Sequence, residues 1–171
     1  MKSEELTAAA EEILRRYEEG LRQTPQSPVY HAEGDVLVHT LMVCDALKGL
    51  PEFKELDQLQ QHIVYVAALL HDIGKIHTTR FVDGDWHTPH HAPTGSNMVR
   101  EMLWREYGLC GNKELMEIRE AICLLIRYHS YPPLSDYCQS HGTHGRHPNL
   151  NVLHPHANAQ YGAPRYNLNH P

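Results

Sequence analysis

The sequence has few of the features that mark secreted or membrane proteins. It contains only four cysteines in 171 residues, at Cys44, Cys110, Cys123 and Cys138. They stand far apart without a Cys-x-x-Cys pair, so we interpret them as free thiols in a reducing compartment. No apolar run approaches the ~20 residues of a membrane-spanning helix, and the acidic start does not resemble a signal peptide. We therefore expect a cytoplasmic protein that makes no membrane contact.

The sequence also lacks an excess of positive charge. Lysine and arginine together number 15 against 21 acidic residues, which gives a net charge of −6. This balance argues against an extended nucleic-acid-binding surface. It is compatible with a small anionic substrate held locally by a metal ion. Oligomeric state is not indicated by the sequence.

The hydrophobic periodicity predicts an all-α fold, a single bundle of five or more helices. The predicted helices span residues 3–19, a segment after Asp35, then 56–73, 95–107 and 113–129. Gly20 is expected to end the first helix, and Asp35 to cap the second. The expected core-facing residues of the second and fifth helices are Val38, Leu41, Met42, Ala46, Leu47, Ile118, Ile122, Leu125 and Ile126. For residues 77–94 we expect an ordered loop with a turn at Asp83-Gly84 and no strands.

The composition changes abruptly after Asp136. Residues 137–171 contain no Asp, Glu or Lys and are rich in His, Pro and Asn. Such a segment buries too little apolar surface to offset the entropy of ordering it. We therefore expect one helical domain over residues 1–136 and a disordered tail over 137–171, arising natively or from truncation or a reading-frame change.

Histidine is the abundant reactive residue, with 15 copies, so a single His-Asp pair means little by itself. The positions of several histidines are more informative. His39 lies near the start of one predicted helix, His71-Asp72 at the end of the next, His90-His91 in the following loop, and His129 at the end of the last. Ends of successive helices can converge in a bundle, and histidine with carboxylate suits first-row metals.

Four segments carry a resemblance to a known family: HxxGDVLVHT, ALLHDIGK, HHAPTGS and LIRYHS, in this order over roughly residues 30–130. They resemble the HD-domain superfamily of metal-dependent phosphohydrolases. The similarity is to the HD region of bacterial tRNA nucleotidyltransferases and to HD modules fused to kinase-like ATPases. The segment ALLHDIGK with an upstream histidine is the specific part, because the later histidine motifs are weaker in so histidine-rich a chain.

The resemblance implies a metal centre, and its expected ligands are His39, His71, Asp72, His91 and His129. It implies one or two divalent ions, of Mn, Fe, Zn, Ni, Co or Mg. Such an ion lowers the pKa of a bound water, which then attacks phosphorus. Asp72 and Lys75 are the expected catalytic residues.

Several assignments stay open at this level. Lys75 either steadies a phosphate oxygen or complements a helix dipole, and His90 is a weaker candidate than His91. Ser130 follows His129 where related sequences often have an acid, so Asp136 is only a potential substitute. Glu33 and Asp35 could be ligands or could support His39, although Asp35 is better explained as a helix cap.

The leading hypothesis for function is a phosphomonoesterase or phosphodiesterase that acts on a small phosphorylated substrate, a nucleotide or an RNA end. The alternative is a catalytically impaired HD module that serves as a nucleotide sensor or scaffold. A third hypothesis, a histidine-rich metal-storage protein, accounts for the tail but not for the order of the motifs.

Overall fold

A computed structural model of the chain describes residues 3–130. This part of the chain holds seven helices and one two-stranded sheet, in the order α1 (Ser3–Gln23), α2 (Val36–Gly49), α3 (Pro51–Lys54), α4 (Gln58–Leu70), α5 (Lys75–Thr78), β1 (Arg80–Val82), β2 (Asp85–His87), α6 (His91–Arg105) and α7 (Lys113–Tyr128). The predicted all-α class is therefore confirmed. The expected tail at 137–171, Asp136 and Cys138 lie outside the described residues.

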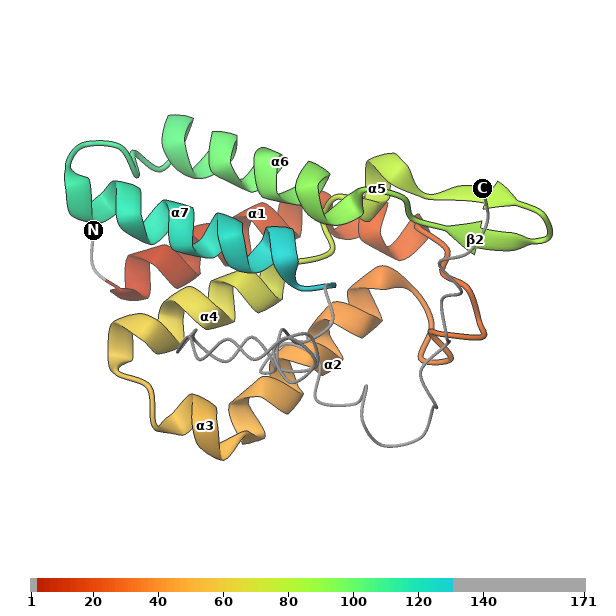
Figure 1. Cartoon of the computed structure of the whole chain (residues 1–171), viewed down its shortest axis with the longest axis horizontal. Helices are drawn as coiled ribbons and strands as arrows, with labels where there is room; N and C mark the ends of the chain where they lie inside the picture. Colours follow the sequence, from red (N-terminus) through yellow and green to blue (C-terminus); the bar gives the residue numbers. More distant parts are fainter. Residues whose placement is uncertain (1–2, 131–171) are drawn as a thin grey trace, which may run out of the picture.

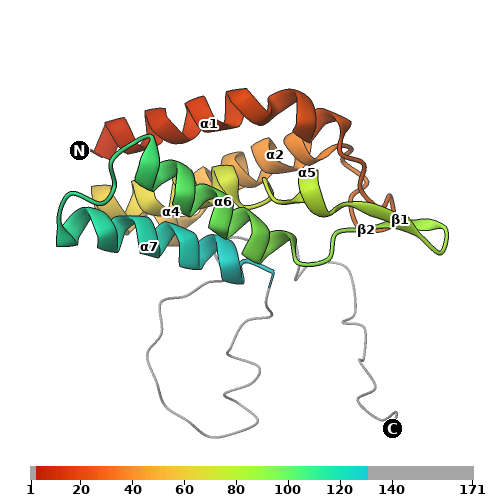
Figure 2. The same cartoon turned by 90° about the horizontal axis from the view of Figure 1, so that it is seen from above.

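Helix α4 lies at the centre of the bundle. It packs against α1, α2 and α7, while α6 packs along α7. Figure 1 shows α4 between α2 and the longer helices, and Figure 2 shows the β1–β2 hairpin projecting from one end of the bundle. No helix within residues 3–130 is long and apolar enough to cross a membrane.

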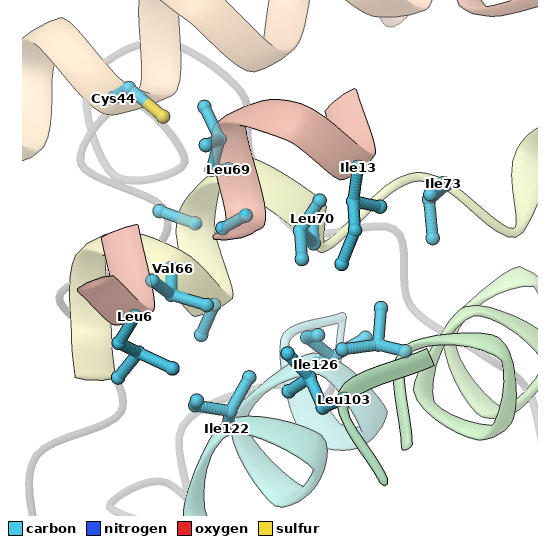
Figure 3. Close-up of a cluster of buried hydrophobic side chains, with 14 of the residues drawn as sticks. Leu6, Ile13, Cys44, Val66, Leu69, Leu70, Ile73, Leu103, Ile122 and Ile126 are labelled. Atoms are coloured by element: carbon cyan, nitrogen blue, oxygen red, sulfur yellow. The ribbon is translucent and has the colours of Figure 1, made fainter. Parts of the chain in front are cut away.

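The core gathers aliphatic side chains from four helices around α4 (Figure 3). Val66 and Leu70 of α4 are fully buried, and they meet Ile13 of α1, Leu103 of α6 and Ile122 of α7 in one cluster. Each such side chain stabilises the fold by about 1.5–3 kcal/mol relative to an exposed position. The second half of α4, residues 63–70, is apolar almost throughout because it has neighbours on several sides.

Side chains cap the starts of α2, α4 and α7. The Asp35 side chain accepts a hydrogen bond from the Val38 backbone N–H and so caps α2, as expected. Asp57 and Gln60 form a reciprocal capping box at the start of α4, which satisfies two backbone donors that the helix leaves unpaired. These caps fix the residues at which α2 and α4 begin.

The predicted end of the first helix and the predicted start of the fourth helix are wrong. Helix α1 does not stop at Gly20 but continues to Gln23, and a Cβ at Gly20 would meet the Ile76 side chain at 3.3 Å. Gly20 therefore permits close packing of α5 on α1. Helix α6 starts at His91 rather than at residue 95, because a proline, here Pro93, is tolerated in the first turn of a helix.

The prediction of a strandless loop over 77–94 is also wrong. Residues 80–82 and 85–87 pair as antiparallel strands with Phe81 opposite Trp86. The turn residues Asp83 and Gly84 have φ values of 51° and 86°, as the type I′ hairpin turn requires. The predicted turn was right, and the aromatic residues flanking it were the missed strand signal.

The third predicted helix, 56–73, is shorter in the structure and ends at Leu70. The core face expected for α2 is partly wrong, since Leu41 and Met42 are exposed at 46% and 49%. Val43 and Cys44 are buried in their place. The nearly continuous apolar composition of α2 left its inner face undefined by periodicity alone.

Candidate metal centre

Four histidines and one aspartate, far apart in sequence, meet at the ends of four helices. His39 lies in the first turn of α2, His71 is the C-terminal cap of α4 and is followed by Asp72, His91 is the first residue of α6, and His129 caps the end of α7. All five side chains belong to two groups that could hold a metal ion, with Asp72 common to both. The five predicted ligands therefore lie together.

The Asp72 carboxylate divides the four histidines into two pairs. Its Oδ2 lies 3.8 Å from His39 Nε2 and 3.2 Å from His71 Nε2. Its Oδ1 lies 3.5 Å from His91 Nε2 and 3.6 Å from His129 Nε2. Two ligands about 2.1 Å from one ion lie at most about 4.2 Å apart, so each pair with its carboxylate oxygen fits one ion.

The hydrogen bonds at the other ring nitrogens fix which nitrogen faces the centre. His71, His91 and His129 each place Nδ1 at 2.7–2.8 Å from a backbone carbonyl, those of Ala68, Thr88 and Ile126 respectively. His39 places Nδ1 at 2.6 Å from Glu33 Oε1. A carbonyl or carboxylate only accepts, so each neutral ring is protonated at Nδ1 and directs an Nε2 lone pair at Asp72.

The centre consequently contains more hydrogen-bond acceptors than donors. His91 Nε2 and His129 Nε2 lie 3.2 Å apart, which sets two lone pairs against each other when both rings are neutral. Among residues 3–130, His71 Nε2 and Asp72 Oδ1 are buried without a hydrogen-bond partner. Buried unpaired acceptors are costly, and a divalent cation satisfies them together. The residues present therefore fit a metal ion.

A comparison with protein families agrees with this geometry. Residues 36–159 match the model of the HD domain, a segment that covers most of the chain. The chain belongs to the HD domain family. No curated protein and no solved structure gives a significant match. HD domains are generally metal-dependent hydrolases, whereas the finer resemblance to tRNA nucleotidyltransferases stays a prediction.

Burial favours the neutral form of two of the histidines, His39 and His91. It lowers the pKa of His39 to about 4, although Asp72 acts in the opposite direction. Burial also lowers the pKa of His91. For Asp72, burial acts to raise the pKa, but the nearby His71 and Lys75 hold it well below its usual value. The site therefore offers neutral rings at His39 and His91 and an ionised carboxylate at Asp72, the protonation states that metal binding needs.

Lys75 is the one cation in the described part of the centre. Its Nζ lies 2.8 Å from Asp72 Oδ2 and donates a 2.7 Å hydrogen bond to Gln26 Oε1. The side chain is buried. Lys75 is the first residue of α5. An ammonium has three donors, which leaves one N–H beyond these two contacts.

The Glu33 carboxylate accepts hydrogen bonds from two histidines beside the metal centre. Its Oε1 lies 2.6 Å from His39 Nδ1 and 3.0 Å from His31 Nδ1. Burial acts to raise the pKa of Glu33, but hydrogen bonds from its own backbone and from both histidines lower it. His39 is thus the one predicted ligand whose ring is oriented by a side chain rather than by a backbone carbonyl. Glu33 precedes the segment matched to the family.

The glycine of the HDIG segment brings the two halves of the centre together. A Cβ at Gly74 would lie 2.1 Å from the His91 carbonyl oxygen and 2.6 Å from the Gly95 backbone nitrogen. No side chain fits in this space, so the turn after Asp72 lies directly against the first turn of α6. This contact sets the position of His91 relative to His71.

The remaining candidates fall outside the cluster. His90 is exposed and takes a left-handed conformation with φ 57° at the start of α6, and it belongs to neither group around Asp72. Asp35 acts as a helix cap. Asp136, the potential substitute for a final acid, lies outside the described residues.

Sequence reasoning missed several residues beside the centre. Gln26, Ser27, Asp85 and Trp86 line a cavity that Lys75 also borders. They belong to the segment before α2 and to the hairpin, and neither segment carries a metal-binding motif. The alternation around the Asp83-Gly84 turn is the signal that could have placed the last two of them.

Proposed function

We propose that the chain is a metal-dependent phosphohydrolase that cleaves a phosphomonoester or phosphodiester of a nucleotide or an RNA end. The observation that carries this proposal is the convergence of four histidine Nε2 lone pairs on the two oxygens of Asp72. A divalent ion held there lowers the pKa of a bound water and offsets negative charge on the phosphate. Membership of the HD domain family supports the same chemistry.

The protein groups have distinct parts in this reaction. The residues that would hold the metal are His39, His71, His91 and His129, through Nε2, together with the Asp72 carboxylate. Lys75 donates its remaining N–H to a phosphate oxygen, and its contact with Asp72 fixes the carboxylate. Burial of Asp72 and His71 excludes bulk water, which strengthens these electrostatic interactions.

The test combines metal content with turnover. The full-length chain, purified without a histidine tag, is assayed by elemental analysis and by hydrolysis of bis-p-nitrophenyl phosphate with Mn²⁺ added. We expect bound metal and turnover, both lost in His39→Ala. The matched control is His62→Ala, because His62 lies on α4 and contacts Thr7 instead of the centre.

Other outcomes separate the alternatives. Metal without turnover on this or other phosphate esters would favour the sensor or scaffold hypothesis and would contradict ours. Metal that is lost on deletion of residues 137–171 but kept in His39→Ala would favour metal storage.

A further inference from the structure

A cavity of about 220 Å³ lies beside the metal centre. It is bordered by the segment before α2, by Lys75 and by the hairpin strand β2 with the residue that follows it. Its lining comprises Gln26, Ser27, Tyr30, His31, Lys75, Asp85, Trp86, His87 and Thr88. Three of these residues also contact groups of the centre: Lys75 pairs with Asp72, His31 bonds Glu33, and the Thr88 carbonyl accepts from His91. The cavity therefore directly adjoins the metal centre.

The polar wall of the cavity is built around the Asp85 carboxylate. Its Oδ2 accepts a 2.7 Å hydrogen bond from the Ser27 hydroxyl, and its Oδ1 accepts a 2.8 Å bond from the Trp86 backbone N–H. These two bonds fix the carboxylate and lower its pKa. Each carboxylate oxygen can accept a second bond, so Asp85 presents acceptors to a hydroxyl or amino group in the cavity.

The apolar wall is aromatic. The Trp86 indole is half-buried and packs edge-on against Phe81, with ring centroids 5.0 Å apart. Tyr30 also lines the cavity and is 76% exposed. Such rings offer flat faces on which a planar group stacks, and they do so with little dependence on which base is present.

We propose that this cavity is a subsite for the nucleoside part of the substrate, with Trp86 stacking on the base and Asp85 accepting from sugar hydroxyls. The inference rests on the proposed hydrolysis of a phosphate ester at the adjacent centre. The cavity is smaller than the roughly 300–1,000 Å³ that encloses a drug-sized ligand, which suits one nucleoside and not two. The Asp85 charge disfavours a second phosphate in this position, so a nucleoside monophosphate is favoured over a triphosphate.

Binding can be measured without catalysis, because the chain has only two tryptophans, Trp86 and Trp104. Trp104 is 51% exposed on α6 and does not line the cavity. In full-length Trp104→Phe, the fluorescence therefore reports on Trp86 alone. We expect saturable quenching by adenosine and by uridine, and calorimetry should give matching Kd values.

Two variants make this measurement decisive. Adding Asp85→Asn to Trp104→Phe should weaken adenosine binding roughly tenfold, since a charge-assisted acceptor is lost. The control, Trp86→Phe, retains Trp104 and should show no quenching. Absence of saturable binding by both methods, or equal affinity in the Asp85→Asn protein, would overturn the subsite.

Kinetic measurements test the subsite separately from the proposed reaction. They also distinguish a free nucleotide from the end of a nucleic-acid strand as the source of the nucleoside. Trp86→Ala should lower kcat/KM for a nucleoside monophosphate roughly tenfold relative to kcat/KM for p-nitrophenyl phosphate. An unchanged ratio refutes the subsite while leaving the hydrolase intact, whereas failure of the wild type on every ester refutes the hydrolase but not nucleoside binding. A short oligonucleotide with a terminal phosphate serves as a third substrate, and a loss on Trp86→Ala confined to it identifies a strand end as the source.

Discussion

The Nε2 atoms of His91 and His129 lie 3.2 Å apart although 38 residues separate them in sequence. Both rings bond a backbone carbonyl through Nδ1, so neither neutral ring can donate to the other. Together with Asp72 Oδ1 they form one three-residue group, and His39 and His71 with Asp72 Oδ2 form another. This division suggests two ions that share one carboxylate.

His91→Ala is the direct test of the metal count. We expect loss of about one equivalent of metal with one retained, because the pair at Asp72 Oδ2 stays complete. Elemental analysis after gel filtration measures the metal content, and His90→Ala is the matched control, since the exposed His90 belongs to neither group. Unchanged metal content in His91→Ala would remove His91 from the ligands, and complete loss would indicate a single site.

Lys75→Met should destabilise the metal-free protein. Removing one partner of a buried ion pair costs about 3–5 kcal/mol because the other charge is left uncompensated, and the Asp72–Lys75 pair is buried on both sides. Saturating Mn²⁺ should restore most of the lost stability, since the ion supplies the missing positive charge. Urea unfolding with and without Mn²⁺ measures this, with the exposed Lys48→Met as control. Equal stability of the metal-free wild type and Lys75→Met would contradict the prediction.

Acid should weaken the metal-free fold through His39. Its pKa is about 4 in the folded protein against about 6.5 in an unfolded chain, so between these values the unfolded state binds more protons. The free energy of unfolding therefore falls as the pH drops from 6.5 towards 4, by on the order of 2 kcal/mol for this residue. Chemical unfolding across this range measures the slope. His39→Gln should flatten it, and an unchanged slope in this variant would assign the effect to other groups.

Glu33→Ala should weaken metal binding without unfolding the chain. Carboxylates that orient a ligating histidine typically contribute 10–100-fold in affinity, and Glu33 is the group that orients His39. Calorimetric titration with Mn²⁺ gives the Kd, and circular dichroism monitors the fold. Glu33→Gln keeps an acceptor for the His39 N–H and should lose less affinity. A Glu33→Ala protein with wild-type affinity would show that backbone packing alone positions this ring.

The predictable part of the centre was the part carried by local sequence. The resemblance of four local segments to the HD-domain superfamily named five ligands, and apolar periodicity placed them at helix ends. These residues are His39, His71, Asp72, His91 and His129. Their ligand role itself stays a prediction that the variants above examine. The geometry that groups them in two pairs depends on side-chain rotamers and long-range packing, which no periodicity encodes.

The parts that escaped prediction depend on tertiary contacts. Gln26 reaches Lys75 across 49 residues, and Ser27 reaches Asp85 across 58, so neither pair has a local signal. Gly20 looked like a helix stop because glycine favours helix ends, but contact with Ile76 explains its place inside α1. In each case tertiary packing outweighed the local preference.

The backbone contact between Gly74 and Gly95 has a consequence for how this protein could be altered. Because main-chain atoms are the nearest neighbours at Gly74, the turn that holds Asp72 and the helix that presents His91 are held in direct backbone contact. Substitutions such as Val99→Ala or Leu103→Ala in α6 should therefore lower the free energy of unfolding while the metal affinity stays near its wild-type value. Gly74→Ala adds only a methyl group, but it should lower both the free energy of unfolding and the metal affinity, because its Cβ would collide with the His91 carbonyl oxygen. The ligand spacing and the stability of this fold can thus be engineered separately.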